Sequence, residues 1–337
     1  MIVLGIETSC DECAAALVEN GNHILSNVVA TQIPFHRAYN GVVPELASRT
    51  HTTWIDSVVQ AAFDQASVSA VDGVAATVQP GLLGSLIVGS SFAKAFAWAK
   101  HIPFIGVDHI LAHLYTVHFC TEVINYPFLG LLVSGGHTII CRVDSFDSIT
   151  VLGTTIDDAV GESFDKVAKH YGFGYPGGVA IDALAREGDP NAFHFPLPRL
   201  YKGEHRYDLS YSGLKTAVIN QSEQFRVKDR TTPADIAASF QKTAIDMLIA
   251  PLLRAVEDTK LSTVGIGGGV AANSLLRERL ALLHLKDVRC IIPPAELCGD
   301  NGAMVAGLGY HYILNGIYSP LTTVVSARVQ AFKKKYP

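Results

Sequence analysis

The sequence has few charged residues and no excess of positive charge. Asp, Glu, Lys and Arg make up 17% of the 337 residues, and 31 acidic against 26 basic residues give a net charge of −5. A sequence-wide positive field that would attract nucleic acid is therefore excluded, and local patches or other proteins would have to supply such attraction. Lys333, Lys334 and Lys335 form one candidate patch, although a run of this kind is more often a solvated tail.

The sequence also lacks the features of a secreted or membrane protein. Its amino terminus has no basic region and turns polar within eight residues, so we expect a cytoplasmic protein. Residues 73 to 93 carry no charge, but Gln79, Pro80 and several hydroxyl residues interrupt them, which favours strand, turn and helix. The six cysteines are expected to be free thiols, and Cys10 and Cys13 lack the second pair that a structural zinc site needs.

One design of strand, polar turn and strand occurs twice. Residues 2 to 18 and residues 128 to 143 share it, and their Leu-Gly-apolar openings begin at Leu4 and Leu129, 125 positions apart (129 − 4). Two similar hairpins at about half-chain separation predict a duplicated α/β domain facing itself across a cleft.

Strands and helices alternate along the rest of the chain, which predicts two α/β lobes. We expect an N-terminal lobe at 1–125, a C-terminal lobe at 126–315 with an irregular insertion at about 187–235, and a tail at 316–337 that returns to the N-terminal lobe. The pattern predicts helices at 54–66, 83–100, 157–171, 234–259 and from 267–269 through 280, strands at 71–78, 103–107 and 264–266, and a Gly/Pro break at 172–178.

Three glycine-rich turns could hold phosphate, because backbone N–H groups approach phosphate oxygens closely only where no Cβ intervenes. They are Ser134-Gly135-Gly136, Gly177-Gly178 and Gly267-Gly268-Gly269. A single turn usually serves backbone geometry alone, but three at strand ends suggest a nucleotide between the lobes, with Asn273 near its base or phosphate.

Acidic residues near such turns usually hold ribose hydroxyls or a metal. Asp165 and Asp182 are therefore candidates for the sugar. The alternatives are a helix-face acid for Asp165 and a helix N-terminal charge for Asp182.

His109 and His113 stand four residues apart on an expected helix, so both imidazoles could bind one metal ion. A core or surface histidine pair is the alternative. Asp300 is the most conspicuous third ligand, and Asp11 is another. Ile110 follows His109, so the H-E-x-x-H motif of zinc proteases is absent, and neither Ser9 nor Ser134 lies in a G-x-S-x-G elbow.

Ten sequence motifs, spread through nearly the whole length of the chain, match those of a known protein family. They are GIETSCDE (5–12), GVVPELASR (41–49), PGLLGSLIVG (80–89), DHILAH (108–113), LLVSGGHT (131–138), DDAVGESFDKVAK (157–169), YPGG (175–178), SYSGLKTA (210–217), GGGVAANSLLR (267–277) and CGDNGAMVA (298–306). With them the chain resembles the bacterial TsaD family, the tRNA N6-adenosine threonylcarbamoyltransferases. The resemblance implies the two-lobed ASKHA fold of actin, Hsp70 and sugar kinases.

The resemblance also implies an activity and a site. Such an enzyme transfers the threonylcarbamoyl group from threonylcarbamoyl-AMP to N6 of adenosine 37 in tRNAs that read ANN codons, and releases AMP. His109, His113 and Asp300 would bind one divalent metal ion, iron or zinc. Asp11 and Glu12 would lie close to the reacting group. The adenylate would be held by Leu132, Val133, Ser134, Gly135, Gly136, Asp165, Gly178, Asp182 and Asn273.

The expected partners are tRNA, a TsaB-like paralogue and a TsaE-like small ATPase. The rival interpretation is an ATP-dependent kinase or ATPase, because the same fold supports both. The chain departs from the family pattern at Cys13, Asn40, Gln79 and Ala112, none of which is an expected ligand.

Overall fold

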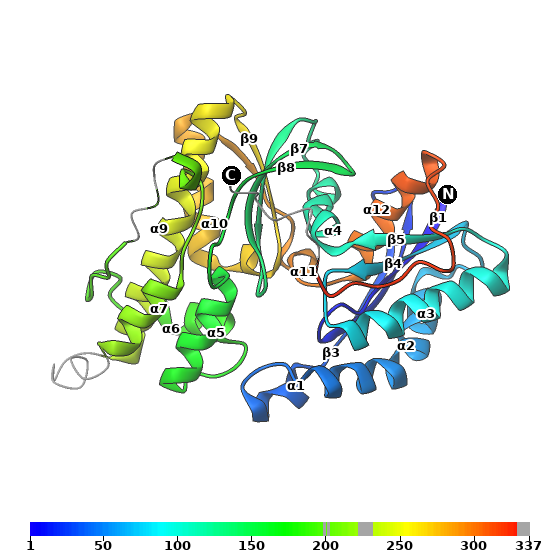
Figure 1. Cartoon of the computed structure of the whole chain (residues 1–337), viewed down its shortest axis with the longest axis horizontal. Coiled ribbons are helices and arrows are strands. Elements are labelled where there is room, and N and C mark those ends of the chain that lie inside the picture. Colours follow the sequence, from blue (N-terminus) through cyan, green and yellow to red (C-terminus); the bar gives the residue numbers. More distant parts are fainter. Residues whose placement is uncertain (198–199, 201–202, 222–231, 329–337) are drawn as a thin grey trace. The chain divides into compact units, whose positions relative to one another are not determined.

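The computed structural model describes the chain except residues 198–199, 201–202, 222–231 and 329–337 (Figure 1). The basic run 333–335 lies outside the described residues. The chain forms two compact units, Met1–Val123 with the described part of Gly299–Phe332, and Ile124–Cys298. The expected boundary placed residues 299–315 with the second lobe. In the structure they group with the first, because helix α12 (Gly302–Leu314) packs against its sheet.

The first unit is built on a five-stranded mixed sheet. Its strands are β1 (Ile2–Glu7), β2 (Glu12–Glu19), β3 (His23–Thr31), β4 (Gly73–Gln79) and β5 (Phe104–Asp108), in the order β3-β2-β1-β4-β5. Strand β2 pairs antiparallel with β1 and β3, whereas β4 pairs parallel with β1 and β5. β1 is buried along nearly its whole length, as expected for a strand covered on both faces.

Helices cover both faces of this sheet. α2 (Pro44–Ala66) and α3 (Leu83–Lys100) pack on the face of Leu4 and Ile6, and α12 packs on the face of Gly5 (Figure 1). Smaller helices are α1 (Ile33–His36), η1 (Arg37–Tyr39), α4 (His109–Tyr115) and η2 (Thr116–Phe119). After α12 the backbone N–H groups of Ser319 and Ser326 donate to carbonyls of β5 and β4 at 2.9 Å.

The second unit repeats this sheet strand for strand. Its strands are β6 (Phe128–Val133), β7 (Thr138–Ser145), β8 (Ser148–Thr154), β9 (Thr263–Gly267) and β10 (Arg289–Ile291), in the order β10-β9-β6-β7-β8. Again three strands form an antiparallel meander and two more run parallel to its first strand. The prediction of two duplicated α/β units is therefore confirmed. The third strand of each meander, β3 and β8, was not predicted.

Helices pack around this second sheet and enclose its core. They are α5 (Val160–Tyr171), α6 (Gly177–Ala185), α7 (Ser212–Asn220), α9 (Pro233–Thr259), α10 (Ser274–Ala281) and α11 (Ala295–Cys298), with η3 (Gly203–His205), η4 (Gly269–Ala272) and η5 (Leu282–Lys286). α6 begins inside the expected Gly/Pro break, and α7 lies in the segment expected to be irregular. Phe164 of α5 and Phe240 of α9 meet in the core with ring centroids 5.0 Å apart.

α9 is long and apolar enough to cross a membrane by length and composition. However, 67% of its most apolar window is buried inside the structure. It is therefore a core helix of the second unit.

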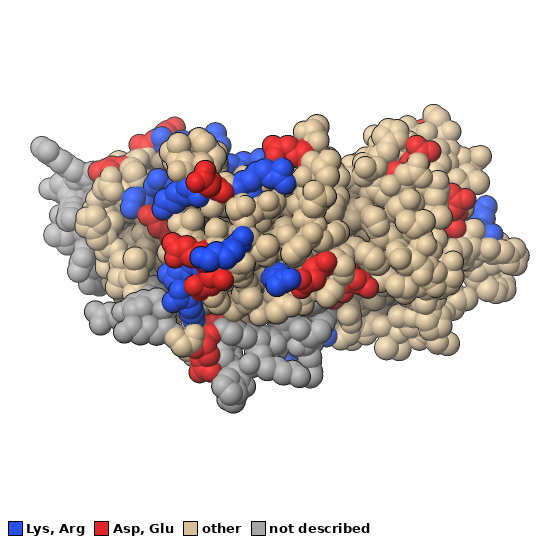
Figure 2. All heavy atoms as spheres, turned by 90° about the horizontal axis from the view of Figure 1, so that it is seen from above, with Lys and Arg blue, Asp and Glu red and all other residues tan. Residues whose placement is uncertain are grey.

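Charges of both signs are mixed on the face drawn in Figure 2. Among the described residues seen there, Lys and Arg side chains lie beside Asp and Glu side chains rather than gathering into one broad basic area. This agrees with the net charge of −5.

Candidate metal centre and nucleotide pocket

The histidine pair stands at the start of a helix that a buried aspartate caps. Asp108 ends β5, and its Oδ1 accepts hydrogen bonds from the N–H groups of Ile110 (2.8 Å) and Leu111 (3.2 Å) of α4. Gln79 donates from Nε2 to the other oxygen of Asp108 at 3.3 Å. Burial raises the pKa of Asp108 to about 6. Gln79, one of the departures from the family pattern, thus supports the cap of the helix that carries both histidines.

His109, His113 and Asp300 converge within the first unit. The Nε2 atom of His113 lies 3.0 Å from Asp300 Oδ1, and that of His109 lies 3.6 Å from the same oxygen. One ligand atom from each residue lies within 4.8 Å of the others. Two imidazoles and a carboxylate are a donor set that suits zinc or iron(II), so this group could hold a metal ion.

A second layer of polar groups orients His109. Its Nδ1 lies 3.2 Å from Glu7 Oε2 and 3.3 Å from Ser9 Oγ. With Nδ1–H donating to the carboxylate of Glu7, Nε2 is the ring nitrogen that faces Asp300, and it would bind a metal ion after releasing its own proton. Glu7 accepts further hydrogen bonds from the Ser9 N–H and the Thr77 hydroxyl. The ring fits a metal centre in orientation as well as in position.

His109 and Glu7 form a buried pair in which each group stabilises the charge of the other. Burial lowers the pKa of His109, but the carboxylates of Glu7 and Asp300 outweigh it and raise that pKa to about 9. Burial likewise opposes ionisation of Glu7, yet His109 holds the pKa of Glu7 below its ordinary value. The group therefore carries compensated charge inside the fold.

Asp11 lies in the hairpin turn after β1, and Glu12 is the first residue of β2. Burial, followed by repulsion from Asp300 and Asp11, raises the pKa of Glu12 to about 9. Thr31 Oγ1 donates to Glu12 Oε1 at 3.2 Å, and the backbone carbonyl of Asp11 accepts from the Gln32 N–H at 3.0 Å. Glu12 therefore lies within electrostatic reach of Asp300, and Asp11 within reach of Glu12.

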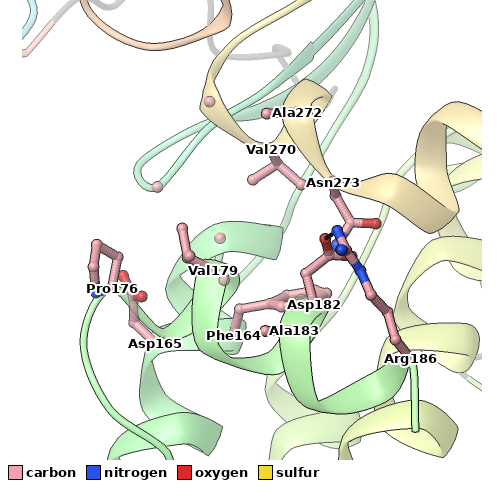
Figure 3. Close-up of a pocket in the computed structure, with 14 residues that line it drawn as sticks. Phe164, Asp165, Pro176, Val179, Asp182, Ala183, Arg186, Val270, Ala272 and Asn273 are labelled. Carbon is pink, nitrogen blue, oxygen red and sulfur yellow. Dashed lines mark hydrogen bonds and ion pairs between the residues drawn. The ribbon is translucent and has the colours of Figure 1, made fainter. Parts of the chain in front are cut away.

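A cavity of about 450 Å³ lies within the second unit (Figure 3). Five of the residues expected to hold the adenylate line it: Gly135, Asp165, Gly178, Asp182 and Asn273. The other four, Leu132, Val133, Ser134 and Gly136, are not among the lining residues. Leu132 and Val133 are buried in β6, and Ser134 Oγ accepts from the His137 N–H at 3.1 Å, which shapes the turn after that strand.

The polar side chains of the pocket are held by neighbours. Asp165 Oδ1 accepts from the Gly177 N–H at 2.8 Å, and Asp182 Oδ1 accepts from the Ser274 hydroxyl at 2.7 Å. Asn273 caps α10 through the Leu276 N–H, and its Nδ2 donates to Gln241 Oε1 at 3.0 Å. These contacts fix the side chains before any ligand binds, which lowers the entropy cost of binding.

The sequence did not point to several residues that line the pocket or support the histidine pair. Val179 and Val270 face the pocket from two elements, and Arg186 lies 3.3 Å from Asp182 Oδ2, one helical turn away along α6 (Figure 3). Apolar residues on short helices carry no signal that separates a ligand contact from core. Glu7 did carry a signal, because an acid at the end of an otherwise apolar buried strand needs a partner.

Comparison of the whole structure with solved structures identifies the fold. Full-length HypF in its phosphate- and nucleotide-bound form superposes with a TM-score of 0.61 at 14% identity, covering 94% of this chain and 47% of HypF. The chain thus spans about half the length of HypF. Component A of the (R)-2-hydroxyglutaryl-CoA dehydratase of Acidaminococcus fermentans gives 0.54 at 15% identity, covering 93% of this chain and 99% of that one. At this identity the likeness defines the class of fold, which is the ASKHA fold.

Sequence comparison then identifies the family. The family model of the tRNA N6-adenosine threonylcarbamoyltransferase TsaD matches residues 23–307. The Treponema denticola enzyme of that name is 60% identical over 338 residues, which are 99% of each chain, and that of Treponema pallidum is 53% identical over 99% of this chain and 95% of its own. The chain belongs to the TsaD family.

Proposed function

We propose that this chain transfers the threonylcarbamoyl group of threonylcarbamoyl-AMP to N6 of adenosine 37 in tRNAs that read ANN codons, with release of AMP. The observation that carries the proposal is full-length membership of the TsaD family together with the convergence of His109, His113 and Asp300. The reaction forms one bond, breaks one bond and releases one proton. The N6 amine bonds to the carbamoyl carbon, the bond from that carbon to the phosphate oxygen breaks, and the amine loses a proton.

The cavity of the second unit takes the adenylate. Val179 and Val270 offer apolar contact to the base, and the carboxylates of Asp165 and Asp182 suit ribose hydroxyls. Gly135 and Gly178 leave the backbone open to the phosphate, since a Cβ at either would meet only open space. Ser134 and Gly136 complete the turn around Gly135, and Leu132 and Val133 hold that turn on β6.

His109, His113 and Asp300 would hold one divalent ion, iron or zinc. When bound, such an ion acts as a Lewis acid that polarises a carbonyl oxygen. Glu7 fixes the tautomer of His109, and Asp108 fixes the first turn of α4. Asp11 and Glu12 position the N6 amine. Because the pKa of Glu12 lies at about 9, Glu12 keeps its own proton at neutral pH, and Asp11 is the carboxylate that accepts the proton of the amine.

Binding of tRNA would depend on local contacts and partners, because the net charge is −5 and charges of both signs are mixed on the face drawn in Figure 2. A TsaB-like paralogue and a TsaE-like ATPase are the partners we propose, acting with this chain in the cytoplasm. Leu83, Ile87 and Trp98 of α3 are 50%, 48% and 71% exposed and offer an apolar surface for the paralogue.

The deciding experiment substitutes one ligand. His109→Ala should abolish threonylcarbamoyladenosine in tRNA, measured by mass spectrometry of nucleosides from cells that rely on the variant, and should lower bound metal in elemental analysis. His23→Ala is the matched control, because its side chain is 67% exposed on β3. Normal modification with His109→Ala would refute the role of the metal group.

The kinase or ATPase alternative has a separate test. Pure protein incubated with ATP and sugars, without tRNA, should show no rapid turnover. Fast hydrolysis or sugar phosphorylation would favour that alternative.

A further inference from the structure

Six buried polar side-chain atoms of the first unit have no hydrogen-bond partner among the described residues, and three of them belong to neighbouring side chains. These three are Nε2 of His36, Nδ1 of His51 and Oε1 of Gln32, and all three residues are 0% exposed. A buried polar atom without a partner costs about 1–3 kcal/mol, so a native fold supplies one. Three such atoms in one place indicate a bound polar molecule.

The three side chains belong to one small region where α1 meets the start of α2. The His36 N–H donates to the Gln32 carbonyl at 3.3 Å, so the two residues share a turn. Gln32 Nε2 donates to the carbonyl of Ala47, which stands one turn before His51. The N–H of Val43, the residue that caps α2, donates to His36 Nδ1 at 3.3 Å. Burial lowers the pKa of His51, and nearby His36 lowers it further.

The observed hydrogen bonds decide which of the three atoms donates. His36 Nδ1 accepts from Val43, so its Nε2 carries the proton and is a donor. His51 Nε2 lies 2.9 Å from the Cys10 carbonyl and must donate to it, which leaves Nδ1 as an acceptor. Gln32 Nε2 also donates to a carbonyl, so its Oε1 is an acceptor. The region therefore presents one donor and two acceptors.

We propose that this region is a binding site for a single buried water molecule. The water accepts from His36 Nε2 and donates to His51 Nδ1 and Gln32 Oε1. Three hydrogen bonds are the usual number for a buried water. A metal cation would meet the N–H of His36, and an anion would meet two acceptor atoms, so neither suits this set.

The water holds together the groups that support the Asp11 turn. His51 donates to the Cys10 carbonyl, and the Gln32 N–H donates to the Asp11 carbonyl at 3.0 Å. His51 and Gln32 are thus positioning residues for Asp11 and, through the turn, for Glu12. This consequence rests on the proposed function, whereas the water site itself does not.

A crystal structure of the full chain at high resolution tests the site directly. One density peak should lie about 2.7–3.2 Å from all three atoms. Absence of the peak, or a direct bond from His36 Nε2 to His51 Nδ1, would overturn the proposal. In His36→Asn the amide oxygen can still accept from Val43, but the shorter side chain has no donor at the position of Nε2, so the peak should disappear. The peak should persist in the control variant His23→Asn.

Kinetics test the positioning role. His51→Phe removes both hydrogen bonds of the ring and should lower kcat of threonylcarbamoyl transfer about tenfold, with KM for threonylcarbamoyl-AMP within about twofold, because the nucleotide pocket lies in the other unit. His51→Gln can still donate to Cys10, so its kcat should fall less, and His23→Asn should match the wild type.

The outcomes of the two tests are distinct. Wild-type kcat in a folded His51→Phe protein would overturn the positioning role, and where that variant does not fold, wild-type kcat in His51→Gln would do so. A wild-type chain without transferase activity would refute the proposed function, while the density peak would still decide the water site.

Discussion

At the scale of single residues, the buried carboxylate of Glu7 has the clearest consequence for metal binding. It contacts His109 Nδ1 and receives donors from Ser9 and Thr77, so every contact orients it toward the ring. Partners of metal-bound histidines fix the tautomer and raise ligand basicity. The strength of metal binding should therefore depend on a residue that is not itself a ligand.

Glu7→Gln keeps the size of the side chain and removes its charge. We expect affinity for Zn²⁺ to fall about 10- to 100-fold, measured by competition with a chelator. The control Glu19→Gln lies on β2, where the Glu19 side chain is 40% exposed, and should leave affinity unchanged. Equal affinities for the two variants would contradict the orienting role of Glu7.

His118 should make stability depend on pH. Burial, followed by repulsion from His311, lowers its pKa from 6.5 to about 4. Between these values the unfolded chain binds more protons than the folded chain, so the free energy of unfolding rises with pH from 4 to 6.5 and falls on acidification. The contribution of this residue across that window is at most about 3 kcal/mol.

The variant His118→Phe should flatten this dependence, measured by urea unfolding at pH 4.5, 5.5 and 7. His23→Phe, at an exposed position, should retain the wild-type slope. An unchanged slope in His118→Phe would show that the ring is not neutral in the folded state.

Much of the metal group could be predicted from sequence, and much of the nucleotide pocket could not. His109 and His113 are separated by one helical turn, and a buried strand immediately before them fixes where that helix starts. Asp300 stood out as an acid in an apolar segment. Val179 and Val270 carry no such mark, because a valine that contacts a ligand and a valine in a core look alike in sequence.

At the scale of elements, the start of α12 approaches both β1 and β2 unusually closely. A Cβ at Gly5 would lie 2.2 Å from the Gly302 carbonyl oxygen, and one at Gly302 would lie 2.5 Å from the Ala16 nitrogen. Backbone atoms cannot yield as flexible side chains do. This contact sets where α12 begins, two residues after Asp300.

Gly302→Ala should therefore displace the start of α12. We expect a loss of about 3 kcal/mol in the free energy of unfolding and a lower metal content, measured by urea unfolding and elemental analysis. Gly213→Ala is the matched control, since its Cβ would meet open space within α7, and it should be neutral or slightly stabilising. A Gly302→Ala protein with wild-type stability and metal content would contradict the close packing.

The elements found from sequence are those with strong local signals. α3 has the bounds that were expected, because Pro80 and Gly81 mark its start and the apolar pattern runs to Lys100. α6 was missed because Gly177 and Gly178, which begin it, are ordinarily a break signal. β3 was missed because five of its nine residues are only half buried, so its apolar and polar residues alternate weakly.

At the scale of the whole molecule, the two repeated units hold different candidate sites, a metal group in the first and a nucleotide pocket in the second. Each unit has the same sheet, with its parallel strands on one side of the first strand and its meander on the other. The first unit uses the ends of β1 and β5 for carboxylates and histidines. The second uses the turns after β6 and β9 for a cavity. No described ligand residue of the metal group lines that cavity.

Binding of the two ligands should therefore be separable. In Asp300→Ala the Kd for adenosine, measured by calorimetry, should stay within about twofold of the wild type, because Asp165, Asp182 and their supporting residues all lie in the second unit. In Asp182→Asn the metal content should be unchanged while the Kd for adenosine rises about tenfold, as expected when a hydrogen bond to a charged acceptor is weakened. Both variants should lose threonylcarbamoyl transfer, because the reaction needs the adenylate and the metal group together. Loss of adenosine binding in Asp300→Ala would show instead that the two sites are coupled before the acyl group is present.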